Sequence, residues 1–144
     1  MSLAVTVVAP APVAATWDRW SDLGRWPEWN PTCAAADVRG PLEPGTLVEL
    51  RLRHPRGGRE FLTRPRLTEV DAPHRLAWEA KGTGFRAAVR SRLEAEHDGT
   101  RVTVEADTTG PLRATYLMTL TEQAQAVLFQ DALTALSRSL GGGS

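Results

Sequence analysis

Residues 112–140 read LRATYLMTLTEQAQAVLFQDALTALSRSL, and this stretch determines how the rest of the chain has to fold. It contains neither Gly nor Pro before Gly141, so we expect one continuous helix. At 1.5 Å per residue this helix is roughly 40 Å long, enough to cross a small domain.

Two apolar stripes run along the expected helix at helical spacing. The first comprises Phe129, Leu133, Leu136 and Leu140. The second, displaced around the axis, comprises Leu117, Leu120, Ala124, Val127 and Leu128. A helix that is apolar over so wide an arc has to be wrapped by other elements. Because the preceding sequence indicates strands, a curved sheet is the expected wrapper.

Composition favours one globular domain without nucleic-acid chemistry. The chain has 144 residues, 42% of them hydrophobic, which suffices for a sizeable core. Its 17 basic and 17 acidic side chains balance, which argues against non-specific nucleic-acid binding. Cys33 is the only cysteine, so neither an internal disulfide nor a Cys-based metal site is expected. We expect a single domain over residues 1–140 and a flexible Gly/Ser tail over residues 141–144.

The opening residues 1–15 are apolar and Ala-rich, as signal peptides are. They lack a basic n-region, however, and Pro10 and Pro12 interrupt them, so a cytoplasmic location is expected. No run approaches the ~18 apolar residues that a membrane span requires.

The first elements are a strand and two short helical pieces. Val5, Val7 and Val8 predict a strand that ends at Pro10, and residues 13–20 continue as a helix. The connector at residues 25–31, RWPEWNP, has room for about one helical turn. Its Trp26 and Trp29 either plug one end of the core or roof a pocket, and the sequence leaves both readings open.

Six further strands follow. Alternating apolar and polar residues predict them over residues 33–39, 46–53, 59–70, 76–80, 85–96 and 102–108. Pro65 interrupts the third of these six, which implies an edge position or a bulge. The sequence His97-Asp98-Gly99 predicts a hairpin turn before the last.

The hairpin strands define an apolar face and a polar face. Val89, Ser91 and Leu93 point one way, while the arginines at 86, 90 and 92 point the other and pair with acidic residues across the ladder. Only the apolar face needs cover. The predicted fold is therefore α+β: a seven-stranded curved antiparallel sheet wrapped around a long C-terminal helix, with two short helices after the first strand.

Three sequence blocks resemble a known superfamily. They are SDLGRWPEWNP at residues 21–31, GPLEPGT at 40–46 and GTRVT at 99–103. With the order of elements, they are similar to the SRPBCC superfamily of helix-grip proteins, which includes START lipid-transfer domains, the birch pollen allergen and aromatic polyketide cyclases. The polyketide cyclase/dehydrase-like branch is the most similar. The resemblance implies a deep, mostly apolar cavity and the binding or transformation of hydrophobic small molecules.

Motifs for metal, nucleotide or nucleophilic chemistry are missing from the sequence. His54, His74 and His97 lie in predicted turns without partners at metal-ligand spacing, so no metal site is expected. No Gly-rich phosphate loop is found, and no cofactor is expected. Ser91 points inward, but no His or Cys stands ready to activate it.

The helix face that meets the cavity decides whether an acid or base is available. Extending the first stripe backward reaches Gln125, Glu122 and Met118. If this face points inward, Glu122 is the candidate catalytic acid or base. If the second stripe points inward, Glu122 is a surface carboxylate, and the cost of burying an unpaired charge slightly favours this alternative.

The candidate ligand-binding residues are aromatic side chains of the connector and sheet, together with inward positions of the last strands and helix. They are Trp26, Trp29, Phe61, Trp78, Phe85, Val89, Ser91, Met118, Gln125 and Phe129. We expect the aromatic members to line or close one internal cavity of ~300–1,000 Å³.

Three functions are compatible with this sequence: a binder or carrier of an apolar, aromatic or polycyclic small molecule, a polyketide cyclase or dehydratase using acid–base chemistry, and a protein-interaction module. A pocket is favoured over a protein partner because sheet and helix account for the apolar residues. Monomer and homodimer both stay open.

Overall fold

The computed structural model describes residues 2–141. Its elements in chain order are β1 (Ser2–Ala9), α1 (Val13–Ser21), the 3₁₀ helix η1 (Leu23–Glu28), β2 (Cys33–Arg39), β3 (Leu47–Arg53), β4 (Glu60–Thr63), β5 (Arg66–Asp71), β6 (Arg75–Gly82), β7 (Phe85–Glu96), β8 (Gly99–Thr109), α2 (Arg113–Thr119) and α3 (Glu122–Leu140). This order confirms the predicted α+β fold, including the two short helices after the first strand.

All strands belong to one antiparallel sheet with the order β1-β8-β7-β6-β5-β3-β2, and β4 pairs with β3. Strands β4 and β5 are the two halves of the predicted strand over residues 59–70, so counting them as one gives the expected seven. The interruption falls at Pro65, whose carbonyl accepts a hydrogen bond from Val48 N. The two halves differ in their partners, because β4 pairs only with β3, whereas β5 pairs with β6 and meets β3 at Leu47 and Arg66.

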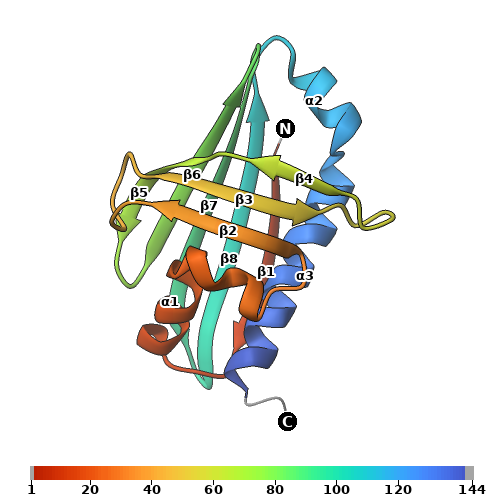
Figure 1. Cartoon of the computed structure of the whole chain (residues 1–144). Coiled ribbons are helices and arrows are strands. Elements are labelled where there is room, and N and C mark those ends of the chain that lie inside the picture. Colours follow the sequence, from red (N-terminus) through yellow and green to blue (C-terminus); the bar gives the residue numbers. More distant parts are fainter. Residues whose placement is uncertain (1, 142–144) are drawn as a thin grey trace.

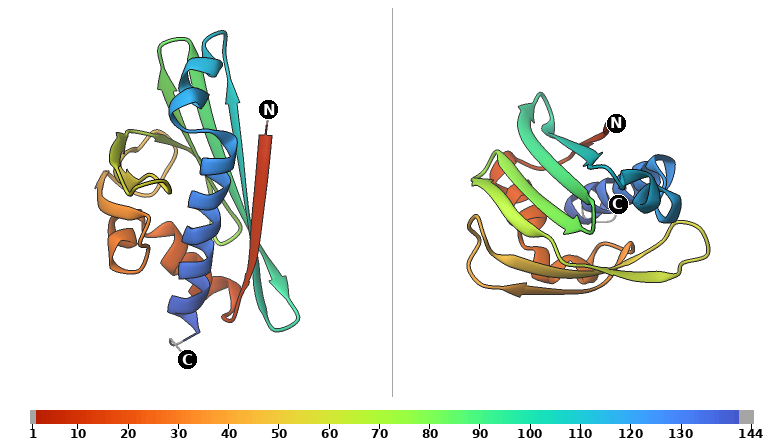
Figure 2. Two further views of the ribbon diagram at one scale, coloured as in Figure 1. Left: turned by 90° about the vertical axis from the view of Figure 1, so that its right-hand side faces the viewer. Right: turned by 90° about the horizontal axis from the view of Figure 1, so that it is seen from above.

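The sheet curls around one side of α3, which lies along β1 (Figures 1 and 2). The buried residues of this helix are Ala124, Gln125, Leu128, Ala132, Leu133 and Leu136. The buried face thus takes members of both predicted stripes, whereas Val127 is 42% exposed. The predicted hairpin register is also confirmed, since Val102 and Val104 are buried and the Arg90 and Arg92 side chains pair with Glu105 on the outer face.

The C-terminal stretch is two helices, so the expectation of one unbroken helix over residues 112–140 is wrong. Leu120 (φ −140°, ψ 89°) and Thr121 (φ −62°, ψ 161°) leave the helical conformation. The Thr121 side chain accepts a hydrogen bond from Ala124 N at 3.1 Å, and Gln125 Nε2 donates to the Leu120 carbonyl at 3.1 Å. Polar side chains therefore stabilise the break by binding main-chain groups that an unbroken helix would pair internally.

This capping arrangement predicts the effect of Thr121→Ala. The substitution leaves a helix N-terminal N–H without its cap, so the free energy of unfolding should fall by about 0.5–2 kcal/mol in urea denaturation. Thr121→Ser keeps the capping oxygen and is the matched control. Equal losses for both substitutions would show that the cap does not stabilise α3.

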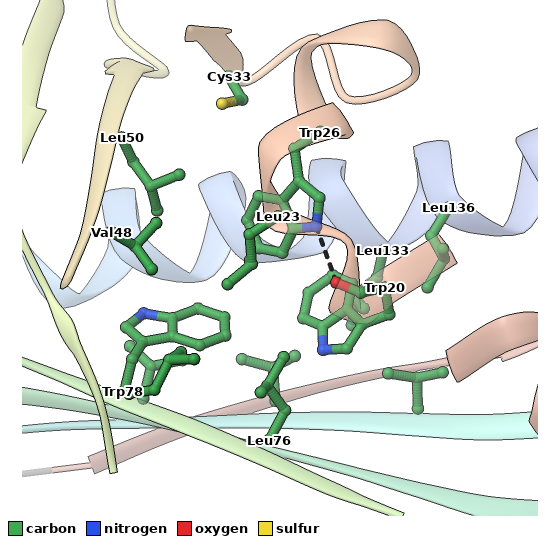
Figure 3. Close-up of a cluster of buried hydrophobic side chains, with 14 of the residues drawn as sticks. Trp20, Leu23, Trp26, Cys33, Val48, Leu50, Leu76, Trp78, Leu133 and Leu136 are labelled. Carbon is green, nitrogen blue, oxygen red and sulfur yellow. Dashed lines mark hydrogen bonds between the residues drawn. The ribbon is translucent and has the colours of Figure 1, made fainter. Parts of the chain in front are cut away.

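Four tryptophans gather at one end of the core. Trp20 and Trp26 have ring centroids 4.8 Å apart, and Trp26 Nε1 donates to the Trp20 carbonyl at 2.9 Å (Figure 3). Trp78 reaches the cluster from β6, and Trp29 lies at its partly exposed rim. Leu133 and Leu136 of α3 belong to the same buried cluster, as do Val89, Leu93, Val102 and Val104 of the sheet. The predicted contact between helix and hairpin is thus present.

The apolar opening of the chain is part of the sheet. Residues 2–9 form β1, which pairs with β8 over its whole length. Among the described residues, no helix combines the length and apolarity needed to cross a membrane. Residues 142–144 of the expected Gly/Ser tail lie outside the described residues.

Candidate ligand-binding site

An inner cavity of about 70 Å³ lies between the sheet and α3. Its aromatic wall comes from five separate elements and consists of Trp26, Phe61, Trp78, Tyr116 and Phe129. Small and aliphatic side chains complete it, among them Leu50, Leu52, Ala87, Val89, Leu128 and Ala132. Such a surface suits an apolar ligand with little hydrogen-bonding capacity.

A larger, open outer chamber of about 520 Å³ adjoins the inner cavity. The two spaces have Phe61, Tyr116 and Leu120 in common, and we refer to these three residues as the shared wall. The outer chamber is otherwise lined by residues of the β3–β4 hairpin, namely His54, Arg56, Arg59 and Glu60. An apolar interior therefore adjoins a charged mouth.

The inner cavity is smaller than the ~300–1,000 Å³ expected from the aromatic content. The difference arises because Trp20, Trp26 and Trp78 pack on one another, with centroids 4.8 to 6.4 Å apart, and fill the space that the indole rings are predicted to enclose. The sequence leaves open whether Trp26 closes one end of the core or lines a pocket. Trp26 has both positions, since it is buried in the core cluster and also lines the cavity.

Six predicted ligand-binding residues are brought together at the inner cavity. They are Trp26, Phe61, Trp78, Val89, Gln125 and Phe129. Gln125 is the polar group supplied by α3. Its Nε2 is engaged by the Leu120 carbonyl, whereas Oε1 accepts no hydrogen bond from any residue in the described part of the chain, which leaves an acceptor for a ligand.

Three predicted residues lie elsewhere because other contacts engage them. Ser91 accepts a hydrogen bond from Trp20 Nε1 at 2.8 Å and donates to the Leu76 carbonyl at 2.7 Å, so its hydroxyl is part of the core. Phe85 stacks on Tyr116, a residue of the shared wall, with ring centroids 4.5 Å apart. Trp29 lines a surface groove beside Arg25 and not the cavity.

Met118 and Glu122 are displaced by the break in the helix. Their predicted places follow from extending the α3 stripe backward, but the helical path is interrupted at Leu120, and Met118 is 83% exposed. Glu122 lies half-buried in the first turn of α3 and does not line the inner cavity or the outer chamber. A carboxylate at this position is stabilised by the helix dipole.

Two residues reach the site from positions that sequence patterns do not favour. His54 is predicted in a solvated turn but lies half-buried in the wall of the outer chamber. Asp107 also lines the inner cavity, although the alternation of side chains along β8 places it on the outer face of the sheet. Its partner across the ladder is Ala88. Because alternate side chains of a strand point to opposite faces, strand alternation by itself does not predict Asp107 in this lining.

Burial controls the protonation of two groups near the site. It raises the pKa of the Tyr116 hydroxyl above its ordinary value, so this group is a proton donor at neutral pH. Burial likewise raises the pKa of the Cys33 thiol to about 11, which keeps the sulfur protonated and unreactive. Among residues 2–141, no three His, Cys, Asp or Glu side chains are grouped so that they could hold a metal ion.

Comparisons with known proteins identify a family for this chain. The family model described as polyketide cyclase / dehydrase and lipid transport matches residues 1–141. A search of curated proteins by sequence returned no match.

Solved structures of low sequence identity share the fold. A START superfamily protein from Mycobacterium smegmatis superposes with a TM-score of 0.78 at 15% identity, covering 99% of each chain. A protein from Thermus thermophilus gives a TM-score of 0.78 at 17% identity, covering 100% of this chain and 99% of the other. The di-domain ARO/CYC BexL from the BE-7585A biosynthetic pathway gives a TM-score of 0.75 at 18% identity. This match covers 97% of this chain but 50% of BexL.

Proposed function

Because this chain belongs to the polyketide cyclase/dehydrase and lipid transport family, we propose that it binds a hydrophobic, aromatic or polycyclic small molecule between the sheet and α3. The observation that carries the proposal is that the apolar inner cavity and the outer chamber adjoin each other at the shared wall. The inner cavity alone is too small for a polycyclic ligand. Such a ligand places one end behind Phe61, Tyr116 and Leu120 and the remainder in the outer chamber.

A titration that follows tryptophan fluorescence tests this proposal. Trp26 and Trp78 line the inner cavity, so a neutral polycyclic aromatic such as 1-aminoanthracene should quench or shift their emission. Ala132→Leu extends a buried α3 side chain into the cavity and should weaken binding by about tenfold or more, since a ligand cannot share the filled space.

The matched control is Ala126→Leu, a change of the same size on the same helix at a position outside the inner cavity. It should bind the probe as the unmodified protein does, and circular dichroism should show both variants folded. Absence of a fluorescence response to a varied panel of neutral aromatics would refute the proposal. Native mass spectrometry of freshly purified protein would identify a retained ligand.

The alternative is a cyclase or dehydratase that uses general acid–base chemistry in the same site. One observation favours it: the half-buried Tyr116 lines both spaces, where its phenol hydroxyl is placed to donate a hydrogen bond to a ligand oxygen. Burial raises the pKa of this hydroxyl, which makes it a weaker acid than an exposed tyrosine. Against it, Glu122 lies outside the lining. The one carboxylate among the described residues that line the inner cavity is that of Asp107, and the burial alternation along β8 directs this side chain to the outer face of the sheet. Binding without catalysis is therefore the preferred function.

We further propose a cytoplasmic location. The proposal is supported by the packing of residues 2–15, since apolar side chains of β1 and α1 pack against the core.

A further inference from the structure

Most arginine side chains of this protein bind a carboxylate or a main-chain carbonyl, and two of the three exceptions lie at the mouth of the site. Within residues 2–141 most arginine side chains contact a carboxylate, and Arg19, Arg53, Arg66 and Arg113 donate to main-chain carbonyls. Arg56, Arg59 and Arg138 alone have no such partner in that range. Two of these three line the outer chamber.

The hairpin that carries the two arginines has a defined geometry. His54 N donates to the Arg59 carbonyl at 2.8 Å, and Gly58 N donates to the His54 carbonyl at 3.1 Å. Gly57 (φ +78°) and Gly58 (φ +70°) adopt the left-handed conformation that lets the chain reverse between them. The turn therefore places Arg56 and Arg59 on the same wall of the chamber.

His54 adds a third donor to this wall. Its Nδ1 accepts a hydrogen bond from Arg56 N at 3.0 Å, so the neutral ring carries its proton on Nε2. The one acidic side chain among the described residues that line the outer chamber, Glu60, lies 4.0 Å from Arg51 Nε and forms no ion pair with Arg56 or Arg59. The mouth thus offers two guanidinium groups and an imidazole donor, and no carboxylate of residues 2–141 is bound to them.

This inference rests on the proposed function: we propose that the ligand is amphipathic, with an anionic carboxylate held by Arg56 and Arg59 and an apolar body that extends through the shared wall into the inner cavity. Guanidinium groups bind carboxylates through paired N–H donors, which orients the bound group. Because both arginines are exposed, their attraction to the ligand is partly screened and weakens with added salt.

Paired acidic and neutral probes separate the two interactions. cis-Parinaric acid has a carboxylate and an apolar chain, and its fluorescence rises in an apolar site, while its methyl ester has the same chain without the charge. The unmodified protein should bind the acid more tightly than the ester. The double variant Arg56→Gln/Arg59→Gln should bind the acid about tenfold more weakly, because two partly solvated ion pairs are lost. Its affinity for the ester should not change.

Arg138→Gln is the matched control, because it removes an arginine that lies in the last turn of α3, outside the chamber, and should change neither affinity. Equal binding of acid and ester, unchanged in the double variant, would overturn this inference and leave hydrophobic binding intact. Failure of both probes to bind the unmodified protein would overturn both proposals. If the double variant loses binding to phosphatidylglycerol vesicles but keeps its affinity for the acid, the arginines contact a membrane surface and the inference is wrong.

Discussion

Replacing Trp20 by Ala is expected to lower the free energy of unfolding by about 3–5 kcal/mol, the largest effect of any single substitution considered for this chain. Trp20 is 0% exposed and lies in contact with Trp26 and Trp78, so its removal leaves a cavity that rigid neighbours cannot fill. Its Nε1 also donates to Ser91 Oγ at 2.8 Å, which ties α1 to β7.

Urea denaturation measures the loss, and two further variants separate its causes. Ser91→Ala removes the hydroxyl that accepts from Trp20 while leaving the indole in place, so it should cost about 1–3 kcal/mol because a buried donor is left unsatisfied. Trp29→Ala removes an indole from the partly exposed rim of the same cluster and should cost less than Trp20→Ala. A loss below about 1 kcal/mol for Trp20→Ala would contradict the packing described for this end of the core.

Leu136→Ala is expected to cost about 2–5 kcal/mol, because Leu136 is fully buried between α3 and the sheet. The change breaks no hydrogen bond of the side chain, so the decrease in the free energy of unfolding measures only the apolar packing between the sheet and α3. Val127→Ala truncates an aliphatic side chain on the exposed side of the same helix and should stay within about 0.5 kcal/mol of the unmodified protein. Similar losses for Leu136→Ala and Val127→Ala would mean that α3 is not held by that face.

These effects concern stability, and the site is affected separately. Trp20 does not line the inner cavity, whereas Trp26 and Trp78 do, so variants of the latter two alter stability and ligand binding together. Ala132 and the exposed arginines of the mouth are therefore better positions at which to test binding.

Most of the architecture follows from patterns that are local in the sequence. The alternation around Val89 and Val102 identifies the buried face of the hairpin, and the leucines at 133 and 136 identify the buried face of α3. Pro65 marks the place where one strand divides into β4 and β5. These inferences succeed because the side chains buried on one face of a helix or strand recur in the sequence with the period of that helix or strand.

The candidate site is predicted only in part, since its lining depends on which side chains are already engaged by distant partners. The parity of Ser91 assigns it to the cavity, yet it bonds with Trp20, 71 residues away. The positions predicted for Met118 and Glu122 require a continuous helix, whereas the helix stops at Leu120, where Thr121 and Gln125 hydrogen-bond to the main chain.

By itself, then, the sequence determined the α+β class, the antiparallel hairpin order and the presence of a gripped C-terminal helix, because each rests on the period of apolar residues along the chain. The tertiary structure alone decided the size of the cavity, the break before α3 and which two arginines of residues 2–141 are left without a carboxylate at the mouth. The size of the cavity depends on how the indole rings pack in three dimensions, and the unpaired arginines depend on which carboxylates lie near which guanidinium groups. Neither the distance between two rings nor the distance between two charged groups follows from their separation in the sequence.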